Sequence, residues 1–431
     1  MSASRSPSRF DVMADDDHAV ANAGLVLTAI LAERLGIETL ADRLVDLGVR
    51  PGGSRPGRMI LTLAQGIVAD GDCIDDVEVL RAGATEAVLG HKAMAASTCG
   101  TFLRSFTFGH IRQLDQLTGE ILGRAWAAGA GPGDEPMTID VDSTICEVHG
   151  YTKQGAAYGY TRVRGLHPLL ATRADTGEVL HVRQRKGSAN TGRGAERFVN
   201  EVAGRVRRAG ATGPLTLRAD SGFHSAKVIA ACRRHHITFS ITVSQNSAVK
   251  DTIAAVDEAA WVVIDYTDGG QAEVAETTYK GDRLIVRRTR LVGHQAALWP
   301  DWRHHAFVTN RVGTAVVLDA DHRNHAVIEL AIRDLKEGAG WNHSPSGKFL
   351  ANAAWIVIGA LAHNLLRWVS ALGLDHRGPV VAKTLRRRLI TIPGRITRSA
   401  RRDQLHLPRR WPWRHQFLTA AVRLRNLPLT R

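Results

Sequence analysis

Cysteine is scarce in this sequence, and its four cysteines lie far apart. They are Cys73, Cys99, Cys146 and Cys232, and no two of them form a C-x-x-C pair. A disulfide framework or a structural zinc site needs cysteines that are numerous or closely spaced, so the sequence favours neither. A reducing, intracellular compartment is the simpler expectation.

The sequence also lacks a long hydrophobic run. Residues 1–18 are polar and acidic, whereas a secretory signal would need an apolar stretch there. The most apolar segment, residues 349–362, is interrupted by Asn352 and followed by His363 and Asn364. It is too short and too polar to cross a bilayer, so it predicts a buried helix and no membrane partner.

Positive charge is present in excess. The 56 lysines and arginines outnumber the 42 aspartates and glutamates, which gives a formal net charge of +14. Such an excess favours a polyanionic partner, because binding releases the counterions that the polyanion holds. Nucleic acid is the first expectation. An anionic membrane surface is the second, although no amphipathic helix with a basic polar face is evident.

Three successive patterns divide the first part of the chain. From Ala23 to Leu122 leucines and alanines recur at three- and four-residue spacing, which predicts that the N-terminal region, residues 1–126, is all-helical. Residues 127–136 are rich in Gly, Ala and Pro and predict a linker. Strands then alternate with helices over 137–258, which predicts an α/β layer with a mixed sheet. We expect the strands at 137–142, 166–174, 178–184, 215–219 and 237–243, and the helices at 194–208 and 225–235.

The second part of the chain begins with a change of pattern. Residues 259–311 lose the helical periodicity and alternate β-branched residues, which predicts a β-rich insertion. Helices return over 312–378, with segments expected at 322–337 and 349–369. Residues 379–431 form a basic C-terminal region that is rich in arginine.

Two aspartates, Asp140 and Asp142, stand at the end of the strand expected at 137–142. Side chains alternate across a strand, so both carboxylates face the same side. Two acids on one face can bind a hard cation that prefers oxygen ligands. Either aspartate could be the metal-binding acid of this strand.

Two further acids stand out. Asp220 follows the strand expected at 215–219, at the edge where α/β sheets usually bind ligands. Glu329 lies on the helix expected at 322–337, on one stripe with His322, His325 and Lys336. Taken singly, an aspartate after a strand is more often a turn former, and a helical glutamate more often a solvated residue. As a set, three carboxylates can hold two Mg²⁺ or Mn²⁺ ions about 3.5 to 4 Å apart and clamp a phosphodiester between them.

A series of motifs accompanies these acids. They are G-D at 71–72 with L-R at 80–81, D-V-D-S-T at 140–144, H-G-Y at 149–151, G-A-A-Y-G-Y at 155–160, R-K-G at 185–187 with Asn190, A-D-S-G-F at 219–223, F-V-T-N at 307–310, and Glu329 with Lys336. With them the chain resembles the DDE transposases of bacterial insertion sequences, specifically the insertion-sequence family numbered thirteen-eighty. The resemblance covers nearly the whole chain.

That resemblance implies a fold and an activity. The α/β layer would be a ribonuclease H-like catalytic core with a mixed five-stranded sheet, interrupted by the insertion. Asp142, Asp220 and Glu329 would be the catalytic triad and would bind two Mg²⁺ or Mn²⁺ ions, with Asp140 a rival to Asp142. The protein would cut double-stranded DNA at the element's terminal inverted repeats and join the 3′-hydroxyl to target DNA. It would act as a homodimer on DNA in the bacterial cytoplasm, associated with the nucleoid.

The resemblance also implies DNA contacts. Lys336 would contact the DNA backbone, and related enzymes carry Tyr and Arg at the positions of His322 and His325. Histidine is shorter than arginine and often neutral at pH 7, so these two positions depart from the family pattern. The remaining residues expected at the DNA are Arg333, Lys186, Arg193 and Trp299. Trp299 would stack on an extruded base, although a packing role is the more common one for a tryptophan.

Two other functions fit the same residues. A nuclease of the same fold would cut DNA with Mg²⁺ or Mn²⁺ but would not join pre-cut ends. A non-catalytic DNA-binding protein derived from a transposase would bind the ends without cutting them, and the two histidines motivate this alternative.

Overall fold

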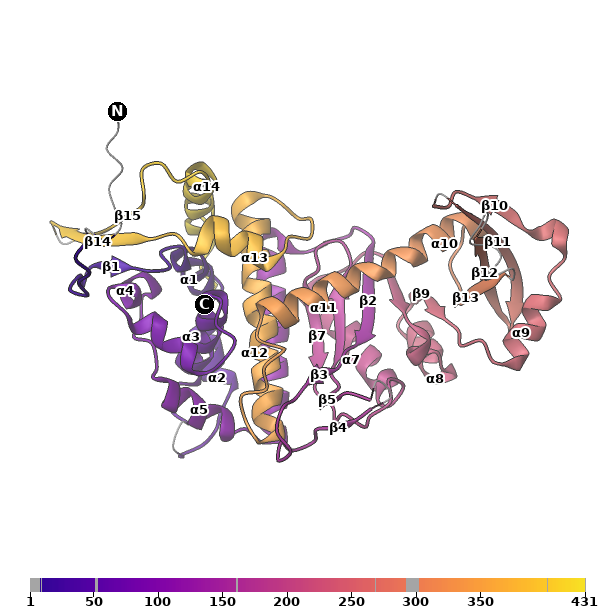
Figure 1. Cartoon of the computed structure of the whole chain (residues 1–431), viewed down its shortest axis with the longest axis horizontal. Coiled ribbons are helices and arrows are strands. Elements are labelled where there is room, and N and C mark those ends of the chain that lie inside the picture. Colours follow the sequence, from indigo (N-terminus) through magenta and orange to yellow (C-terminus); the bar gives the residue numbers. More distant parts are fainter. Residues whose placement is uncertain are drawn as a thin grey trace.

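The computed structural model describes residues 8, 10–50, 53–159, 162–267, 269–291, 302–400 and 402–430. A nine-stranded sheet runs from the middle of the molecule to one end, where the strands of the β-rich insertion form its outer part (Figure 1). The N-terminal helices and the C-terminal elements lie at the opposite end of the molecule.

The N-terminal region is helical apart from the short strand β1 (Ala19–Val20). Its helices are α1 (Leu25–Arg34), α2 (Ile37–Leu44), α3 (Pro56–Val68), α4 (Thr85–Leu89), α5 (Ala96–Arg104) and α6 (Phe108–Ala125), with a 3₁₀ helix at Asp75–Arg81. Proline begins α3, where its missing N–H costs nothing. Thr107 caps α6 by accepting a hydrogen bond from the backbone N–H of His110, and the His110 ring accepts one from that of Thr107.

The residues expected to form a linker do not separate two independent bodies. A widened helical turn, Trp126–Ala130, continues α6. The indole N–H of Trp126 donates to the buried carboxylate of Glu178 at 3.0 Å. This contact ties the helical region directly to the sheet.

The five strands expected in the α/β layer form the core of the sheet. They are β2 (Met137–Ser143), β6 (Leu169–Arg173), β7 (Val179–Arg183), β8 (Leu215–Ala219) and β9 (Ile237–Thr242). Their order is β7-β6-β2-β8-β9. Strand β2 runs parallel to β8 and β8 parallel to β9, while β6 is antiparallel to β2 and β7 to β6. A small separate sheet holds β3 (Cys146–Glu147), β4 (Ala157–Tyr158) and β5 (Arg164–Leu166).

Three helices alternate with these strands: α7 (Ala195–Ala209), α8 (Ala226–Arg234) and α9 (Ser247–Ala254). Helix α7 buries Phe198, Val202 and Val206, whose spacing of four residues puts them on one face, while its outer face carries charge. It ends at Gly210, whose φ of 112° is one that side chains with a Cβ rarely adopt.

The β-rich insertion extends the core sheet and does not stand apart from it. Its strands are β10 (Val262–Ile264), β11 (Gly270–Tyr279), β12 (Asp282–Leu291) and β13 (Arg303–Thr309). Strand β13 pairs antiparallel with β9, so the sheet that was expected to have five strands has nine. The pairing covers the open edge of β9.

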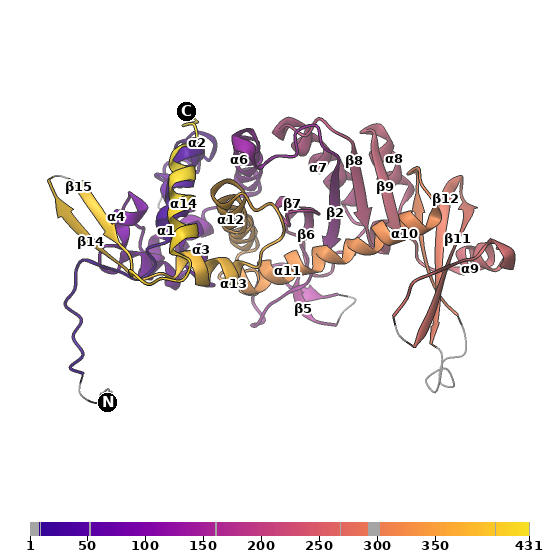
Figure 2. The ribbon, with the colours of Figure 1, turned by 90° about the horizontal axis from the view of Figure 1, so that it is seen from above.

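The single helix expected at 322–337 is two helices in the structure. They are α10 (Ala315–Arg323) and α11 (Val327–Gly338), joined by a 3₁₀ turn at Asn324–Ala326. Together they cross in front of the sheet (Figure 1) and, viewed from above, run along one side of it (Figure 2).

Helix α12 (Phe349–Trp368) is the central helix of the molecule, and a widened turn, Val369–Gly373, continues it. By length and composition the segment Phe349–Gly373 could cross a membrane, but 89% of its apolar window is buried inside the protein. The apolar run therefore serves as the core helix that its sequence predicts.

The basic C-terminal region folds back onto the N-terminal region. It contains α13 (Ala382–Leu385), β14 (Gly394–Ser399), β15 (Arg402–His406) and α14 (Arg414–Arg425). Strand β14 pairs with β1 on one side and with β15 on the other. Helix α14 packs against α1, so the two ends of the chain form one body.

Candidate catalytic site

The parallel pairing of β2 and β8 brings two of the expected acids to one edge of the sheet. Asp142 lies near the end of β2, and Asp220 follows β8 directly. Because parallel strands end at the same edge, both carboxylates lie there. Asp142 accepts a hydrogen bond from the backbone N–H of Ser143 at 2.6 Å, and Asp220 accepts one from Gly222 at 3.1 Å.

Glu329 reaches this edge from the helix that crosses it. It lies in the first turn of α11, which packs against β2, and its side chain is exposed. Its charge is close enough to raise the pKa of Asp142. The structure therefore brings Asp142, Asp220 and Glu329 into one electrostatic neighbourhood.

The site concentrates negative charge in a partly buried place. Burial raises the pKa of Asp142 to about 6, and the charges of Asp220 and Glu329 add to the shift. The Ser143 N–H and His325 oppose it. Burial also raises the pKa of Asp220. Two neighbouring carboxylates thus disfavour the charged form of Asp142, and a hard divalent cation, which prefers oxygen ligands, would remove that repulsion.

The spacing of the three acids bears on how many ions they suit. Among the described residues, the only three ligand atoms of His, Cys, Asp or Glu that lie within 4.8 Å of one another belong to Asp72, Cys73 and Asp76. Asp142, Asp220 and Glu329 do not form such a compact set in the described residues. Two-metal sites hold their ions about 3.5 to 4 Å apart, so their ligands are spread over a longer distance than the ligands of one ion.

Asp140, which the sequence left open as a metal-binding acid, forms an ion pair in the structure. Both of its oxygens are bound by Arg218, from Nε at 2.7 Å and from Nη2 at 2.9 Å, and its side chain is fully buried. His325 Nδ1 lies 3.1 Å from the same carboxylate. Both oxygens of Asp140 are thus engaged by Arg218, whereas Asp142 is the aspartate of β2 whose pKa is raised by the charges of Asp220 and Glu329.

Arg218 was missed by the sequence interpretation. Besides Asp140, its guanidinium donates to the carbonyl of Asp321 at 2.6 Å and to that of Asn324 at 3.3 Å. These carbonyls lie where α10 gives way to the 3₁₀ turn, so Arg218 holds the break that sets the course of α11. The signal that could have found Arg218 was its position two residues before Asp220, just as Asp140 stands two residues before Asp142. On paired parallel strands, matching positions put Arg218 and Asp140 on the same face.

His325 connects this ion pair to the acids. Its Nδ1 faces Asp140, while its Nε2 is buried without a hydrogen-bond partner in the described part of the chain. Its charge would favour the ionised forms of both Asp142 and Asp220. His325 therefore lies at the acids, as the helical spacing predicts.

His322, which the sequence places among the DNA contacts, is buried in the structure. Its ring is buried and stacks on Phe307 with centroids 4.1 Å apart. Its two nitrogens lie 2.7 Å from the hydroxyl of Ser240 and 3.0 Å from that of Thr242. Burial, together with nearby positive groups, lowers the pKa of His322 to about 2. The helix break turns this residue toward β9.

Replacing His322 with glutamine tests this structural role. The folded-state pKa lies far below the ordinary 6.5, so His322 contributes stability that is present above pH 6.5 and is lost as the pH falls. We expect His322→Gln to cost about 1–3 kcal/mol at pH 8. The difference in the free energy of unfolding between wild type and variant should shrink by about 1.4 kcal/mol for each pH unit below 6.5. Urea unfolding at pH 8, 6 and 5 measures this, and a cost that does not change with pH would contradict it.

The other residues expected at the DNA lie in different surroundings. Lys186, Arg193 and Arg333 are exposed, and Lys336 is half-buried. The charge of Lys336 acts on Cys146 of β3, which places it beside the small sheet. Trp299 lies outside the described residues.

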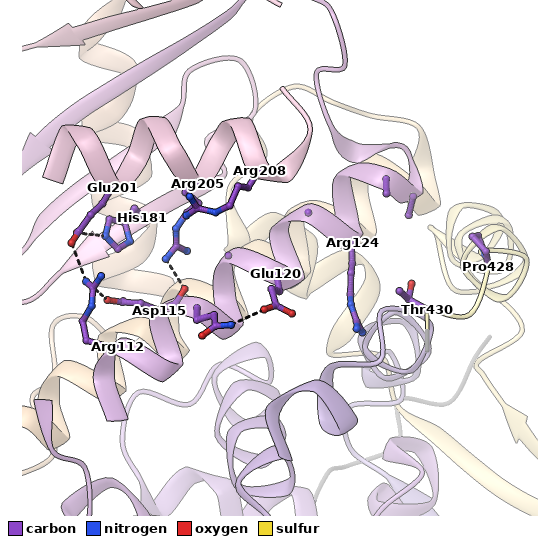
Figure 3. A pocket seen from close by; sticks show the side chains of 15 residues that line it. Arg112, Asp115, Glu120, Arg124, His181, Glu201, Arg205, Arg208, Pro428 and Thr430 are labelled. Carbon is purple, nitrogen blue, oxygen red and sulfur yellow. Dashed lines mark hydrogen bonds and ion pairs between the residues drawn. The ribbon is translucent and has the colours of Figure 1, made fainter. Parts of the chain in front are cut away.

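A large cavity of the described chain lies away from this site. It measures about 870 Å³ and lies between α6, α7 and the C-terminal residues Pro428 and Thr430 (Figure 3). Carboxylates line it as well as arginines: Arg112 pairs with Glu201 at 3.0 Å and with Asp115 at 3.2 Å, and Arg205 donates to the Asp115 carbonyl at 2.6 Å. The contacts fasten the helical region to the core, and none of the three clustered acids lines the cavity.

The raised pKa of Asp142 predicts a gain in stability on removing its charge. The folded protein holds a proton there that the unfolded chain has released, so this group's contribution falls as the pH rises from 3.8 through about 6. We expect Asp142→Asn to raise the free energy of unfolding by about 1–2 kcal/mol at pH 8 without divalent ions. At pH 5 the gain should be smaller. Urea unfolding in EDTA at both pH values measures it, and equal stabilities at pH 8 would contradict it.

Together these features define a class: a basic α/β protein with a cluster of acids at the carboxyl edge of a mixed sheet. A family model described as transposase DDE domain, group 1, matches residues 5–429, and the chain belongs to this family. A comparison with curated protein sequences found no match. Among solved structures, the chain is similar to the piggyBac transposase in its synaptic complex with hairpin DNA. The two are 12% identical with a TM-score of 0.47, over 86% of this chain and 79% of that one.

Proposed function

We propose that the protein is a DNA transposase of the insertion-sequence family numbered thirteen-eighty, which cuts DNA at the ends of its element and joins them to target DNA. The observation that carries the proposal is the meeting of Asp142, Asp220 and Glu329 at one edge of the sheet. Membership of a DDE transposase family supports it.

The strand order supports a ribonuclease H-like core. In the order β7-β6-β2-β8-β9 the first three strands are antiparallel neighbours, and the last two run parallel to β2. This order puts the two aspartates on adjacent parallel strands. In this proposal residues 137–258 and 312–378 form the catalytic core, and 259–311 form an insertion that lengthens its sheet.

In the proposed reaction, water attacks the phosphorus at the element's end and the bond to the 3′-oxygen breaks, which leaves a 3′-hydroxyl. That hydroxyl then attacks a phosphorus in target DNA and displaces its 3′-oxygen, so one phosphodiester replaces another. Asp142, Asp220 and Glu329 would hold two Mg²⁺ or Mn²⁺ ions, which supply charge stabilisation for the attacking and leaving oxygens. His325, held by Asp140, faces the same space.

The DNA contacts of this proposal come from several parts of the chain. Lys336, Arg333, Lys186 and Arg193 would bind backbone phosphates near the acids, which positions the DNA without selecting its sequence. Residues 1–126 and the basic region 379–431 would hold the terminal inverted repeats. The active form would be a homodimer on two DNA ends, in the bacterial cytoplasm and associated with the nucleoid.

The buried position of His322 weakens the alternative of an inactive, DNA-binding relic. That alternative was motivated by two histidines at expected DNA contacts, and one of them instead packs against Phe307. A nuclease without strand transfer remains the competing activity.

Strand transfer with the native element ends tests the proposal. Pre-cut ends carrying a 3′-hydroxyl are incubated with a target plasmid and Mg²⁺ or Mn²⁺. Joined products support a transposase, cleavage of uncut ends without joining supports the nuclease, and end binding without either reaction supports the relic.

A further inference from the structure

A second, smaller groove has an electrostatic character that the large cavity lacks. It measures about 550 Å³ and lies between the α5–α6 turn and the start of α12. Three basic side chains, Arg50, Arg104 and Lys348, line it, and no carboxylate does. The remaining lining residues are Thr101, Ser105, Phe106, Thr107, Gln154 and Leu350.

The three cations of this groove have no counterion in the described part of the chain. Each donates instead to a neutral oxygen at 3.4 Å: Arg50 to the Ser105 carbonyl, Arg104 to the Thr101 hydroxyl, and Lys348 to the Arg104 carbonyl. All three side chains are exposed. In the large cavity, by contrast, Arg112 is paired with Glu201. Uncompensated charge in an open groove attracts an anion.

The groove joins the helical region to the catalytic core. Arg50 and Arg104 belong to the first, whereas Gln154 and Lys348 belong to the second. The Gln154 N–H donates to the Gly347 carbonyl at 2.9 Å, and the Phe349 N–H donates to the Gln154 side chain at 3.3 Å. These hydrogen bonds fix the segment of Gln154 to the segment of Lys348, and the two segments form the side of the groove that belongs to the core.

A continuous run of contacts leads from the groove to the acids. Next to Gln154, the Gly155 carbonyl accepts a hydrogen bond from Gly187 at 2.9 Å, beside Lys186. Lys186 forms a β-bridge with Leu166. The adjacent His167 lies 2.9 Å from the hydroxyl of Ser143, the neighbour of Asp142. These contacts run through the buried residues Leu166 and His167 and link the wall of the groove to the segment that carries Asp142, while Lys186 beside them is exposed.

We propose that the groove of Arg50, Arg104 and Lys348 binds the sugar–phosphate backbone of duplex DNA whose scissile bond lies at the acids. Three cations with hydroxyl and amide groups around an open channel match phosphate oxygens, which accept hydrogen bonds from both. The groove then anchors the helical region and the core to one duplex. This inference rests on the proposed function and names where its substrate is held.

DNA binding at several salt concentrations tests the groove. The variant Arg50→Gln, Arg104→Gln, Lys348→Gln is compared with a control that loses three exposed lysines on α8, α9 and the β11–β12 turn, Lys227→Gln, Lys250→Gln, Lys280→Gln. Fluorescence anisotropy with a labelled duplex gives the affinity. The groove variant should bind about 10-fold or more weakly, and its plot of log K against log salt should be less steep by about 2 to 3. The control should change either quantity far less.

A charge-conserving variant, Arg50→Lys with Arg104→Lys, separates lost charge from misfolding and should keep the wild-type slope. A groove variant with wild-type affinity and slope overturns the inference, as does an equal loss in the control. Either result leaves the proposed function standing if the wild type still joins ends. Loss of binding to phosphatidylserine vesicles with DNA affinity intact would also overturn the inference, in favour of a membrane surface.

Discussion

Replacing Asp142 with asparagine is expected to reduce end cleavage and strand transfer by at least about a thousandfold, or ~4 kcal/mol of transition-state stabilisation. The substitution keeps the shape of the side chain but removes a carboxylate that, in the proposed function, would bind the catalytic cations. Asp220→Asn and Glu329→Gln should have effects of similar size. Single-turnover assays with native ends and Mg²⁺ measure all three.

Two further results make this prediction sharp. DNA affinity measured in EDTA should stay within about threefold of wild type, because the acids themselves repel phosphate. Asp140→Asn should act through stability, since both oxygens of this carboxylate are bound by Arg218. Full activity in Asp142→Asn together with loss in Asp140→Asn would show that the two aspartates have been assigned the wrong way round.

The largest effect on stability is expected from Arg218→Met. It leaves Asp140 buried without its counterion and frees the carbonyls of Asp321 and Asn324. Breaking a buried pair by removing one partner typically costs about 3–5 kcal/mol. Urea unfolding at pH 7.5 measures the loss.

The matched control is Arg81→Met, which breaks an exposed pair with Glu78 and should cost less than about 1 kcal/mol. The double variant Arg218→Met, Asp140→Leu should recover much of the stability, because no charge is then left buried alone. Its activity should stay low, since the junction that sets the course of α11 has lost its clamp. An Arg218→Met protein as stable as Arg81→Met would contradict this role.

The strands of the α/β core and the positions of its acids could be predicted from the sequence because their signals are local. Alternation put Asp140 and Asp142 on one face, and an aspartate after each of two strands placed both near a sheet edge. The parallel pairing of β2 with β8 turns those local signals into one site. Helical spacing likewise placed Glu329 and His325 on one stripe of a helix, and both lie near this site.

The errors arose where distant segments decide the outcome. A helical wheel assumes an unbroken helix, but Arg218 holds a 3₁₀ turn between His322 and Glu329, and His322 consequently faces β9. The sheet was expected to have five strands, because no local pattern reveals that β13 of the insertion will pair with β9. The basic C-terminal region gave no sign that β14 would pair with two residues of β1. The groove of Arg50, Arg104 and Lys348 is assembled from three distant segments.

The most direct test of the account is to locate Mn²⁺ by anomalous diffraction in crystals of the wild-type protein. We predict two Mn²⁺ ions held among Asp142, Asp220 and Glu329, both lost in Asp142→Asn. Mn²⁺ bound only at the competing set of Asp72, Cys73 and Asp76, with none at the three acids, would contradict the assignment of the catalytic site.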